Sequence, residues 1–112
     1  MAAAAFSVMA HSVVAVAATF SNRAITGLGT APAAGARVLG FTKFQAAAGD
    51  RVTVDILGST IAEAGAAVAI DTLLEVDAQG RVITKTTGVA VGRALQAASG
   101  AGQMVEVFLF PN

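Results

Sequence analysis

The clearest pattern of hydrophobic and polar positions occurs twice along the chain, in residues 38–57 and 90–109. Each stretch carries a glycine, then a glutamine followed by two alanines, and then the pattern G-x-x-V-x-V. The corresponding residues are Gly40 and Gly92, Gln45 and Gln96, and Gly49–Val54 and Gly102–Val107. Because an internal repeat reports on the architecture as a whole, the two copies predict two strand pairs of the same design in one small β domain.

The end of the first copy alternates with the two-residue period of a half-buried strand. The predicted strand covers residues 51–57, and Gly58 closes it. Its inward side chains are expected to be Val52, Val54 and Ile56, with Thr53 and Asp55 facing water.

The last strand of the second copy is hydrophobic on both faces near its end. Its inward set is Val105, Val107 and Leu109, and its outward set is Glu106, Phe108 and Phe110. A strand of this kind is usually covered on both sides. Either the N-terminal segment of the same chain or a neighbouring subunit would supply the second cover.

The remaining strands are predicted from shorter signals. A hairpin is expected from residues 73–76 and 81–85, because Asp77 opens and Gly80 closes the turn between them. Residues 38–44, 89–95 and 104–110 complete the repeated strand pairs, while residues 60–69 fit either a short helical turn or an irregular crossing. Seven or eight short strands predict an all-β fold, a small β-barrel or sandwich.

The first 20 residues carry no charge except at His11. A signal peptide is disfavoured because the first basic residue is Arg23, and a membrane-spanning helix is disfavoured because the segment is rich in alanine and interrupted by polar residues. Alternation from Val14 to Phe20 favours an extended arm or edge strand, paired inside the fold or with a neighbouring subunit. We therefore divide the chain into an N-terminal arm and loop, residues 1–30, and a β domain, residues 31–112.

Composition indicates a surface that is covered by other proteins. The 112 residues have a formal net charge of zero, and only 12% of them are charged, about half the usual share for a soluble domain. A chain with so few charges is expected to form an oligomer or a lattice. The seven basic residues are spaced singly, so no nucleic-acid surface is expected, and no membrane partner is expected either.

Candidate chemistry is sparse. His11 is the only histidine and there is no cysteine, so a paired-histidine or cysteine metal site is excluded. Asp71, Glu75 and Asp77 lack the order of a calcium-binding loop, since Asp77 opens a turn and Glu75 is expected to alternate outward on a strand. We expect no catalytic residue, no metal site and no cofactor.

The exposed apolar residues predict a protein interface. Phenylalanine and methionine must anchor it, because the chain has no tryptophan or tyrosine. The predicted interface residues are Phe6, Val8, Met9, Val14, Val16, Phe20, Phe108 and Phe110.

Residues 35–109 resemble the small capsid cement, or head decoration, proteins of tailed bacteriophages. Four pieces carry the resemblance in order: V-L-G-F from Val38, A-A-A-G-D-R-V-T-V from Ala46, A-E-A-G-A-A-V-A-I-D from Ala62, and D-A-Q-G-R-V from Asp77 followed by V-G-R-A-L-Q-A-A-S from Val91. Residues 1 to about 30 match no motif of that family.

The resemblance implies a β-rich structural protein with no catalytic residue. Such proteins are made in the host cytoplasm and sit in the virion on the outer surface of the capsid, often as homotrimers, where they bind the major capsid protein and stabilise the shell by non-covalent contacts. Two other functions stay open: a self-assembling major shell or fibre subunit, and, as the weakest hypothesis, a small β-barrel enzyme. A decorator should stop at a small closed oligomer, whereas a shell or fibre subunit should keep growing with concentration.

Overall fold

Eight strands and no helix make up the part of the chain that the structure describes, residues 7–112 of a computed structural model. The strands are β1 (Ser7–Val14), β2 (Ala24–Ile25), β3 (Gly40–Thr42), β4 (Arg51–Glu63), β5 (Leu73–Val76), β6 (Val82–Thr84), β7 (Gly92–Ala94) and β8 (Met104–Leu109). The predicted all-β class is confirmed.

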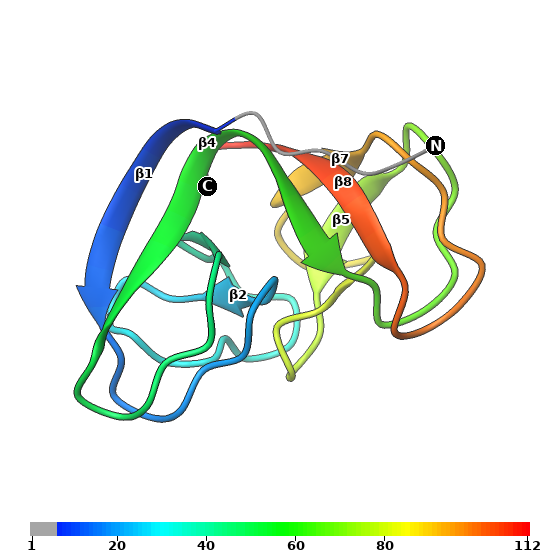
Figure 1. Ribbon diagram of the computed structural model, residues 1–112. Helices are drawn as coiled ribbons and strands as arrows, with labels where there is room; N and C mark the ends of the chain where they lie inside the picture. The colour runs from blue at the N-terminus through cyan, green and yellow to red at the C-terminus, as the bar shows by residue number, and fades with distance from the viewer. Residues whose placement is uncertain (1–6) are drawn as a thin grey trace.

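A single antiparallel path of strands wraps into a small barrel-like sheet. The order along the path is β2-β3-β4-β8-β7-β5-β6, and β1 pairs with β4 beside it. The N–H of Ala24 in β2 donates to the carbonyl of Gly80 in the β5–β6 turn at 2.7 Å, which brings the two ends of the path together. Figure 1 shows β4 running beside β1, bending, and continuing beside β8.

The length of β4 differs from the prediction. The strand was expected to close at Gly58, but it continues to Glu63 and takes in the first part of the ambiguous segment 60–69. Gly58 has a φ of 95°, which a residue with a side chain rarely adopts, so the strand changes direction there without ending. The first half of β4 pairs with β1 and β3, and the second half pairs with β8.

The change of direction also explains why Asp55 is buried, although it was expected to face water. Strict alternation fails just before the bend, where Val54 and Asp55 are both buried. The Asp55 carboxylate accepts a hydrogen bond from the Thr60 hydroxyl at 2.9 Å and lies 3.4 Å from the Lys43 ammonium. These partners stabilise a carboxylate that would otherwise be costly to bury.

The internal repeat is longer in the structure than in the sequence. Strands β1, β2, β3 and the first half of β4 form a first unit, and the second half of β4, β5, β7 and β8 form a second unit with the same pairing. Asn22 and Asp71, the two described non-glycine residues with positive φ, hold the same place in the two units. Each donates its N–H to the last residue of the neighbouring strand, Thr42 or Ala94, at 2.8 Å. Strand β4 therefore ends one unit and begins the next, and β6 belongs to the second unit alone.

The structure corrects the predicted alignment of the two copies at one point. Ala46 bridges Thr19 in the first unit and Ala98 bridges Val68 in the second, so Ala46 corresponds to Ala98. Gln96 then corresponds to Phe44 and not to Gln45. The two glutamines were aligned because alanine-rich sequence matches itself in more than one register, whereas backbone hydrogen bonds allow only one.

The repeated glycines have a common reason. Gly40 and Gly92 lie so close to the paired strand that an added Cβ atom would meet its backbone, at the carbonyl oxygens of Asp55 and Phe108 respectively. The strands around them are shorter than expected, since residues 38–44 and 89–95 contribute only three-residue strands, β3 and β7. The inward and outward faces of β8 agree with the prediction, with Val105, Val107 and Leu109 buried.

The N-terminal strand lies earlier than the alternation indicated. Alternation was expected to mark a strand from Val14 to Phe20, but β1 ends at Val14 and the next residue, Ala15, is buried. After it, only Thr19 forms a bridge, to Ala46. Strand β1 pairs with the first half of β4 of the same chain, and the predicted division at residue 30 stays a prediction.

The predicted β5–β6 hairpin is confirmed, but its glutamate faces inward. Asp77 caps the turn by accepting hydrogen bonds from the N–H groups of Gln79 and Arg81 at 3.0 and 2.9 Å. Glu75 was expected to point outward and is buried, because its carboxylate accepts N–H groups from the following loop, those of Thr86 at 2.6 Å and Gly88 at 3.1 Å.

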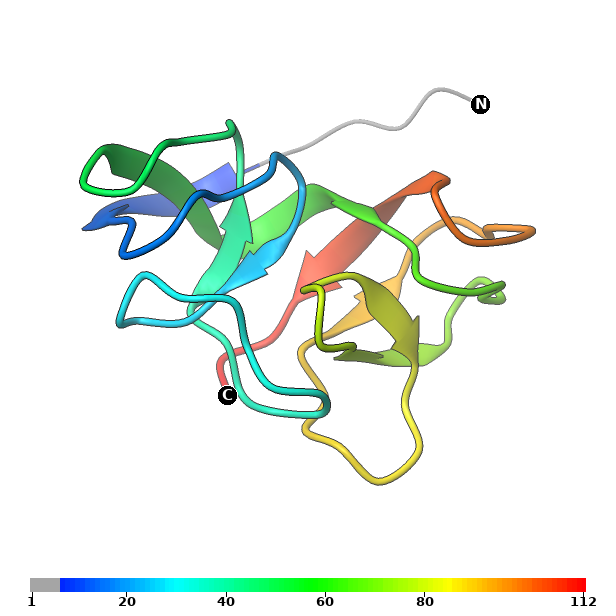
Figure 2. The same cartoon turned by 90° about the horizontal axis from the view of Figure 1, so that it is seen from below.

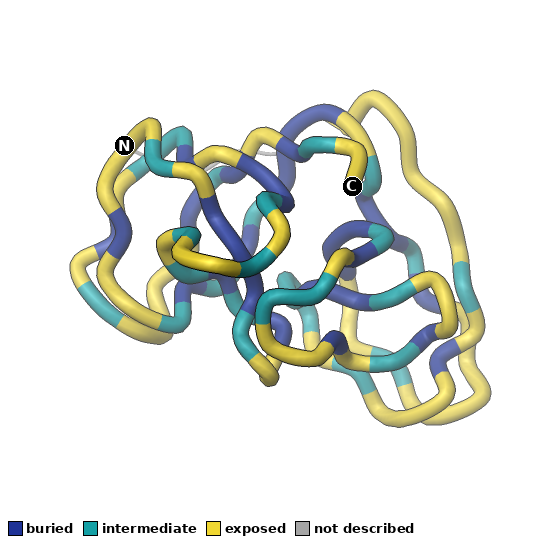
Figure 3. Tube along the Cα trace, turned by 180° about the vertical axis from the view of Figure 1, so that it is seen from behind, coloured by how far each residue is buried: buried dark blue, intermediate teal, exposed yellow. Residues whose placement is uncertain are grey.

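Two groups of buried side chains fill the interior. The backbone trace in Figure 3 shows the buried residues mainly in the middle of the molecule and the exposed residues mainly in the outer loops. The smaller group lies within the first unit and contains Ala15, Ile25, Val52 and Val54. The larger group fills the second unit and also includes Phe41 and Ala24 from the first. In Figure 2 the C-terminus lies beside the segment that leads into β3, where Asn112 accepts the N–H of Val38 at 2.8 Å.

Candidate functional site

Most of the predicted interface residues are on the surface, and the structure distributes them over two apolar hollows and an edge. Val8, Met9, Val14, Val16, Phe20 and Phe108 are exposed, and Phe110 is partly buried. Phe6 lies outside the described residues. Where exposed large apolar side chains form a patch, they indicate a contact surface for another protein.

The first hollow joins the two ends of the chain. It is a groove of about 320 Å³ between β1, β4 and the C-terminal residues, and Met9, Leu57 and Phe110 line it. Met9 and Leu57 are paired across β1 and β4, while Phe110 directly follows β8. The groove therefore brings together two predicted residues that are far apart in the sequence, and its lining is mainly apolar.

An aromatic pair continues from this groove onto the second unit. The rings of Phe108 and Phe110 meet edge to face with their centroids 5.9 Å apart. The Arg93 guanidinium lies 5.9 Å from the centre of the Phe108 ring and 3.9 Å from the Asp71 carboxylate. Phe108 keeps 41% of its surface exposed, so the described part of the N-terminal segment does not cover it.

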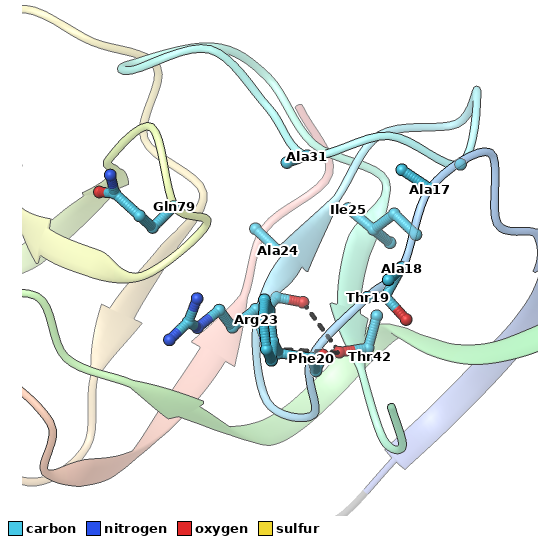
Figure 4. Close-up of a pocket in the computed structure, with 11 residues that line it drawn as sticks. Ala17, Ala18, Thr19, Phe20, Arg23, Ala24, Ile25, Ala31, Thr42 and Gln79 are labelled. Atoms are coloured by element: carbon cyan, nitrogen blue, oxygen red, sulfur yellow. Dashed lines mark hydrogen bonds between the residues drawn. The ribbon is translucent and has the colours of Figure 1, made fainter. Parts of the chain in front are cut away.

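The second hollow contains Phe20 and lies on the other side of the first unit. It is a pocket of about 180 Å³ lined mostly by small or apolar side chains, among them Ala18 and Ile25. In Figure 4, the Thr42 hydroxyl lies against the backbone of this pocket, where it donates to the Phe20 carbonyl at 2.5 Å. Gln79, from the β5–β6 turn of the second unit, lines the opposite side.

Arg23 forms the charged wall of this pocket. Its guanidinium lies 4.7 Å from the centre of the Phe20 ring and 3.2 Å from the Glu63 carboxylate. The Arg23–Glu63 pair joins the first unit to the second half of β4, so its charge is used inside the fold. The pocket with Phe20 and the groove with Met9 and Phe110 share no lining residue, so they are separate surfaces.

Several exposed apolar residues were missed by the sequence reasoning. Leu57 was placed at the end of a strand without a stated side, and Leu28, Phe44 and Leu73 received no role, although all four are exposed. Alternation does not identify Leu73, because Leu73 and Glu75 are two positions apart on the same strand, yet Leu73 is exposed and Glu75 is buried.

The polar groups of the described region offer no constellation for catalysis or metal binding. No group of three His, Cys, Asp or Glu residues that could hold a metal ion occurs among residues 7–112. His11 is exposed on β1, at a distance in sequence from the acidic residues. The loop N–H groups of Thr86 and Gly88 hold the pKa of Glu75 below its ordinary value, because they stabilise the ionised carboxylate. The hydrogen bonds of that carboxylate, all at Oε1, close its own loop.

None of the described residues belongs to a helix of the length and hydropathy that a membrane crossing requires.

Comparison with known proteins gives a family and a similar solved fold. The model of a family described as phage cement protein matches residues 1–109. Among solved structures, the fold is similar to the N base of the head fiber gp8.5 of bacteriophage phi29, with 16% sequence identity, a TM-score of 0.75, and coverage of 91% of this chain and 93% of that one. No curated protein matches the chain.

Proposed function

The chain belongs to the phage cement protein family, and from this membership we propose that it binds the outer surface of a phage head and stabilises the shell by non-covalent contacts. Its role is that of a structural capsid decoration protein. The proposed partners are the major capsid protein and further copies of this chain in a homotrimer, the proposed location is the outside of the virion capsid after synthesis in the host cytoplasm, and no catalytic activity is proposed.

The groove between Met9, Leu57 and Phe110 is the observation that supports shell binding most directly. It is apolar, it is open to solvent, and it is built from strands whose backbones are already paired. A rigid apolar surface loses little conformational entropy when it docks, since its side chains are largely positioned beforehand. The low charge of the chain fits a contact in which few charged groups must lose water.

Modest contacts are sufficient for a decoration protein. Full burial of a phenylalanine side chain contributes roughly 1.5–3 kcal/mol. If several copies are joined in one oligomer, each further contact forms at a high effective concentration, and the combined affinity exceeds that of one site by about 10²–10⁴.

The experiment uses purified chain and mature capsids that lack it. We expect the chain to co-sediment with the capsids and to raise the temperature at which they rupture. Phe110→Asp should reduce co-sedimentation at least tenfold, because a carboxylate would have to be buried in the groove. The matched control is Val89→Asp, which places the same charge at an exposed valine in the loop after β6. A folded wild-type chain that binds no capsid would refute shell binding, and equal binding by both variants would refute the role of the groove.

A self-assembling shell or fibre subunit is the second candidate. The observation that favours it is β1, which pairs with β4 on one edge and has no strand on its other edge among residues 7–112. Unpaired edges are templates for further strands. Light scattering against concentration separates the two functions, because a decorator stops at a fixed size and a fibre subunit continues to grow.

A further inference from the structure

The junction between the two units of the chain shows how one unit covers the first strand of the next. The second half of β4 is the first strand of the second unit, and the first unit covers its outer edge. The N–H of Glu63 donates to the Asn22 carbonyl at 2.9 Å, and the Glu63 carboxylate pairs with Arg23. In this half of β4 Ser59 and Thr60 are buried, and Ala62 belongs to the larger core group.

Strand β1 is the first strand of the first unit, so it corresponds to the second half of β4. Within residues 7–112, no other unit covers its outer edge. Its pairing with β4 matches the pairing of the second half of β4 with β8, so His11 corresponds to Thr60 and Val14 to Glu63. Seven of its eight residues are nevertheless exposed, and Val13 is partly buried. By the same register, the N–H of Val14 points away from β4, as that of Glu63 points away from β8.

The matching surface on the second unit is exposed as well. Leu73 corresponds to Ala24, and it is 45% exposed where Ala24 is 5% exposed. Phe108 corresponds to Asp55, and it is 41% exposed where Asp55 is 1% exposed. Positions that are small or polar inside the chain are thus large and apolar where no second unit of the described chain covers them.

We propose that β1 of one copy docks on the second unit of another copy, in the arrangement of the internal junction. In this contact the N–H of Val14 donates to the carbonyl of Asp71, as the N–H of Glu63 donates to that of Asn22. In the internal junction Arg23 pairs with Glu63. In the proposed contact Thr72 takes the place of Arg23 and Val14 takes the place of Glu63, so an apolar side chain stands where the glutamate was. His11 takes the place of Thr60 and faces Phe108.

A second copy of the chain is the occupant because both halves of the contact are present on this sequence and, within the described residues, are exposed at the same time. The internal junction supplies the geometry, and the exchanged side chains are compatible: Val14 and Thr72 stand where Glu63 and Arg23 form an ion pair, and Leu73 stands where Ala24 is buried. The contact joins two different surfaces, so it is heterologous, unlike a two-fold contact of β1 with β1. The inference builds on the proposed self-association. Because the test of the inference contains no capsid, a negative result would leave the proposed shell binding unaffected.

The test is sedimentation velocity of the full chain and of two variants, Val14→Arg and Leu73→Arg. Wild-type chain should sediment as an oligomer. Each variant alone should lose at least about tenfold in self-association, because an unpaired guanidinium would be buried at the contact. Mixed in equal amounts, the two variants should form a heterodimer, because one intact β1 and one intact second unit remain. The control, Val89→Arg, should associate like wild type.

Three results would overturn the proposal. The first is a wild-type chain that stays monomeric at the highest soluble concentration. The second is a Leu73→Arg variant that still forms homodimers, which would show β1 pairing with β1. The third is a mixture of the variants that yields no heterodimer although circular dichroism shows both to be folded. If Val14→Arg does not fold, Ser12→Arg on the same exposed strand replaces it, with the same expected results.

Discussion

Replacing the two repeated glycines by alanine tests both the close strand contacts and the equivalence of the two units. At Gly92 an added Cβ atom would lie 2.6 Å from the carbonyl oxygen of Phe108 and 2.6 Å from a methyl group of Val107. At Gly40 the added Cβ atom would overlap the carbonyl oxygen of Asp55, at a shorter distance than either contact at Gly92. In both places the obstacle is the backbone of a paired strand, which moves only if the strand pair separates.

The size of the effect follows from two opposing contributions. Overpacking by one methyl group costs about 1–3 kcal/mol. An alanine also restricts the unfolded chain, which stabilises the native state by about 0.4–1 kcal/mol. We expect Gly92→Ala to lower the free energy of unfolding by roughly 1–2 kcal/mol and Gly40→Ala by roughly 2–3 kcal/mol. With about 4–8 °C per kcal/mol for a domain near this size, Gly40→Ala should lower Tm by roughly 10–20 °C.

The assay is urea unfolding at one protein concentration, followed by circular dichroism. Gly100→Ala is the matched control, because no atom lies within 4 Å of its added Cβ and its φ is not in the left-handed region. The control should be neutral or slightly stabilised. If Gly40→Ala were as stable as Gly100→Ala, the close contact between β3 and β4 would be wrong. A large effect at only one of the two repeated glycines would contradict the equivalence of the units.

The remaining predictions concern single contacts. Phe108→Ala should weaken association between copies by about 0.6–1.2 kcal/mol, which is the exposed 41% of the value for a full ring, and a dilution series in sedimentation velocity measures it. Asp55→Ala should lower the free energy of urea unfolding by about 1–3 kcal/mol, because the buried Thr60 hydroxyl loses its acceptor, whereas Asp55→Asn should cost less; equal losses would contradict this. The pKa of Glu75 in the folded state lies below its ordinary value of 4.5. The ionised carboxylate therefore stabilises the fold above pH 4.5, and this stabilisation is lost as the pH falls through the folded-state pKa. Urea unfolding from about pH 6 to about pH 3 should therefore show a smaller loss of stability for Glu75→Gln than for wild type, although Gln places an amide against the Thr86 N–H.

Local patterns predicted β8 and the β5–β6 hairpin correctly. The alternation of β8 gave the correct inward set, and the Asp77–Gly80 turn gave the correct hairpin. Prediction failed where one strand changes partners. Asp55 precedes the bend of β4, and its carboxylate contacts Thr60 beyond the bend and Lys43 after β3, so it is buried at a place that no two-residue period describes.

For the predicted interface residues too, the sequence identified the residue type and the fold decided the location. Composition and alternation identified Met9 and Phe110 as apolar residues without a partner in the local strand pattern. Only the fold places them in one groove, because β1 and β8 pair with consecutive halves of β4, so that Met9 lies opposite Leu57 and Phe108 opposite Ser59. Phe20 has the same composition signal, but the turn after β1 carries it to a different pocket.

The sequence by itself determined the all-β class, the existence of a repeat and the apolar, weakly charged surface, because these depend on residue type and on spacing over a few positions. The tertiary structure decided that β4 belongs to both units, that Glu75 and Asp55 are buried, and that β1 lacks the cover which its counterpart has. Those outcomes depend on hydrogen bonds between residues that are distant in sequence, and a local period carries no information about which distant backbone a strand will meet.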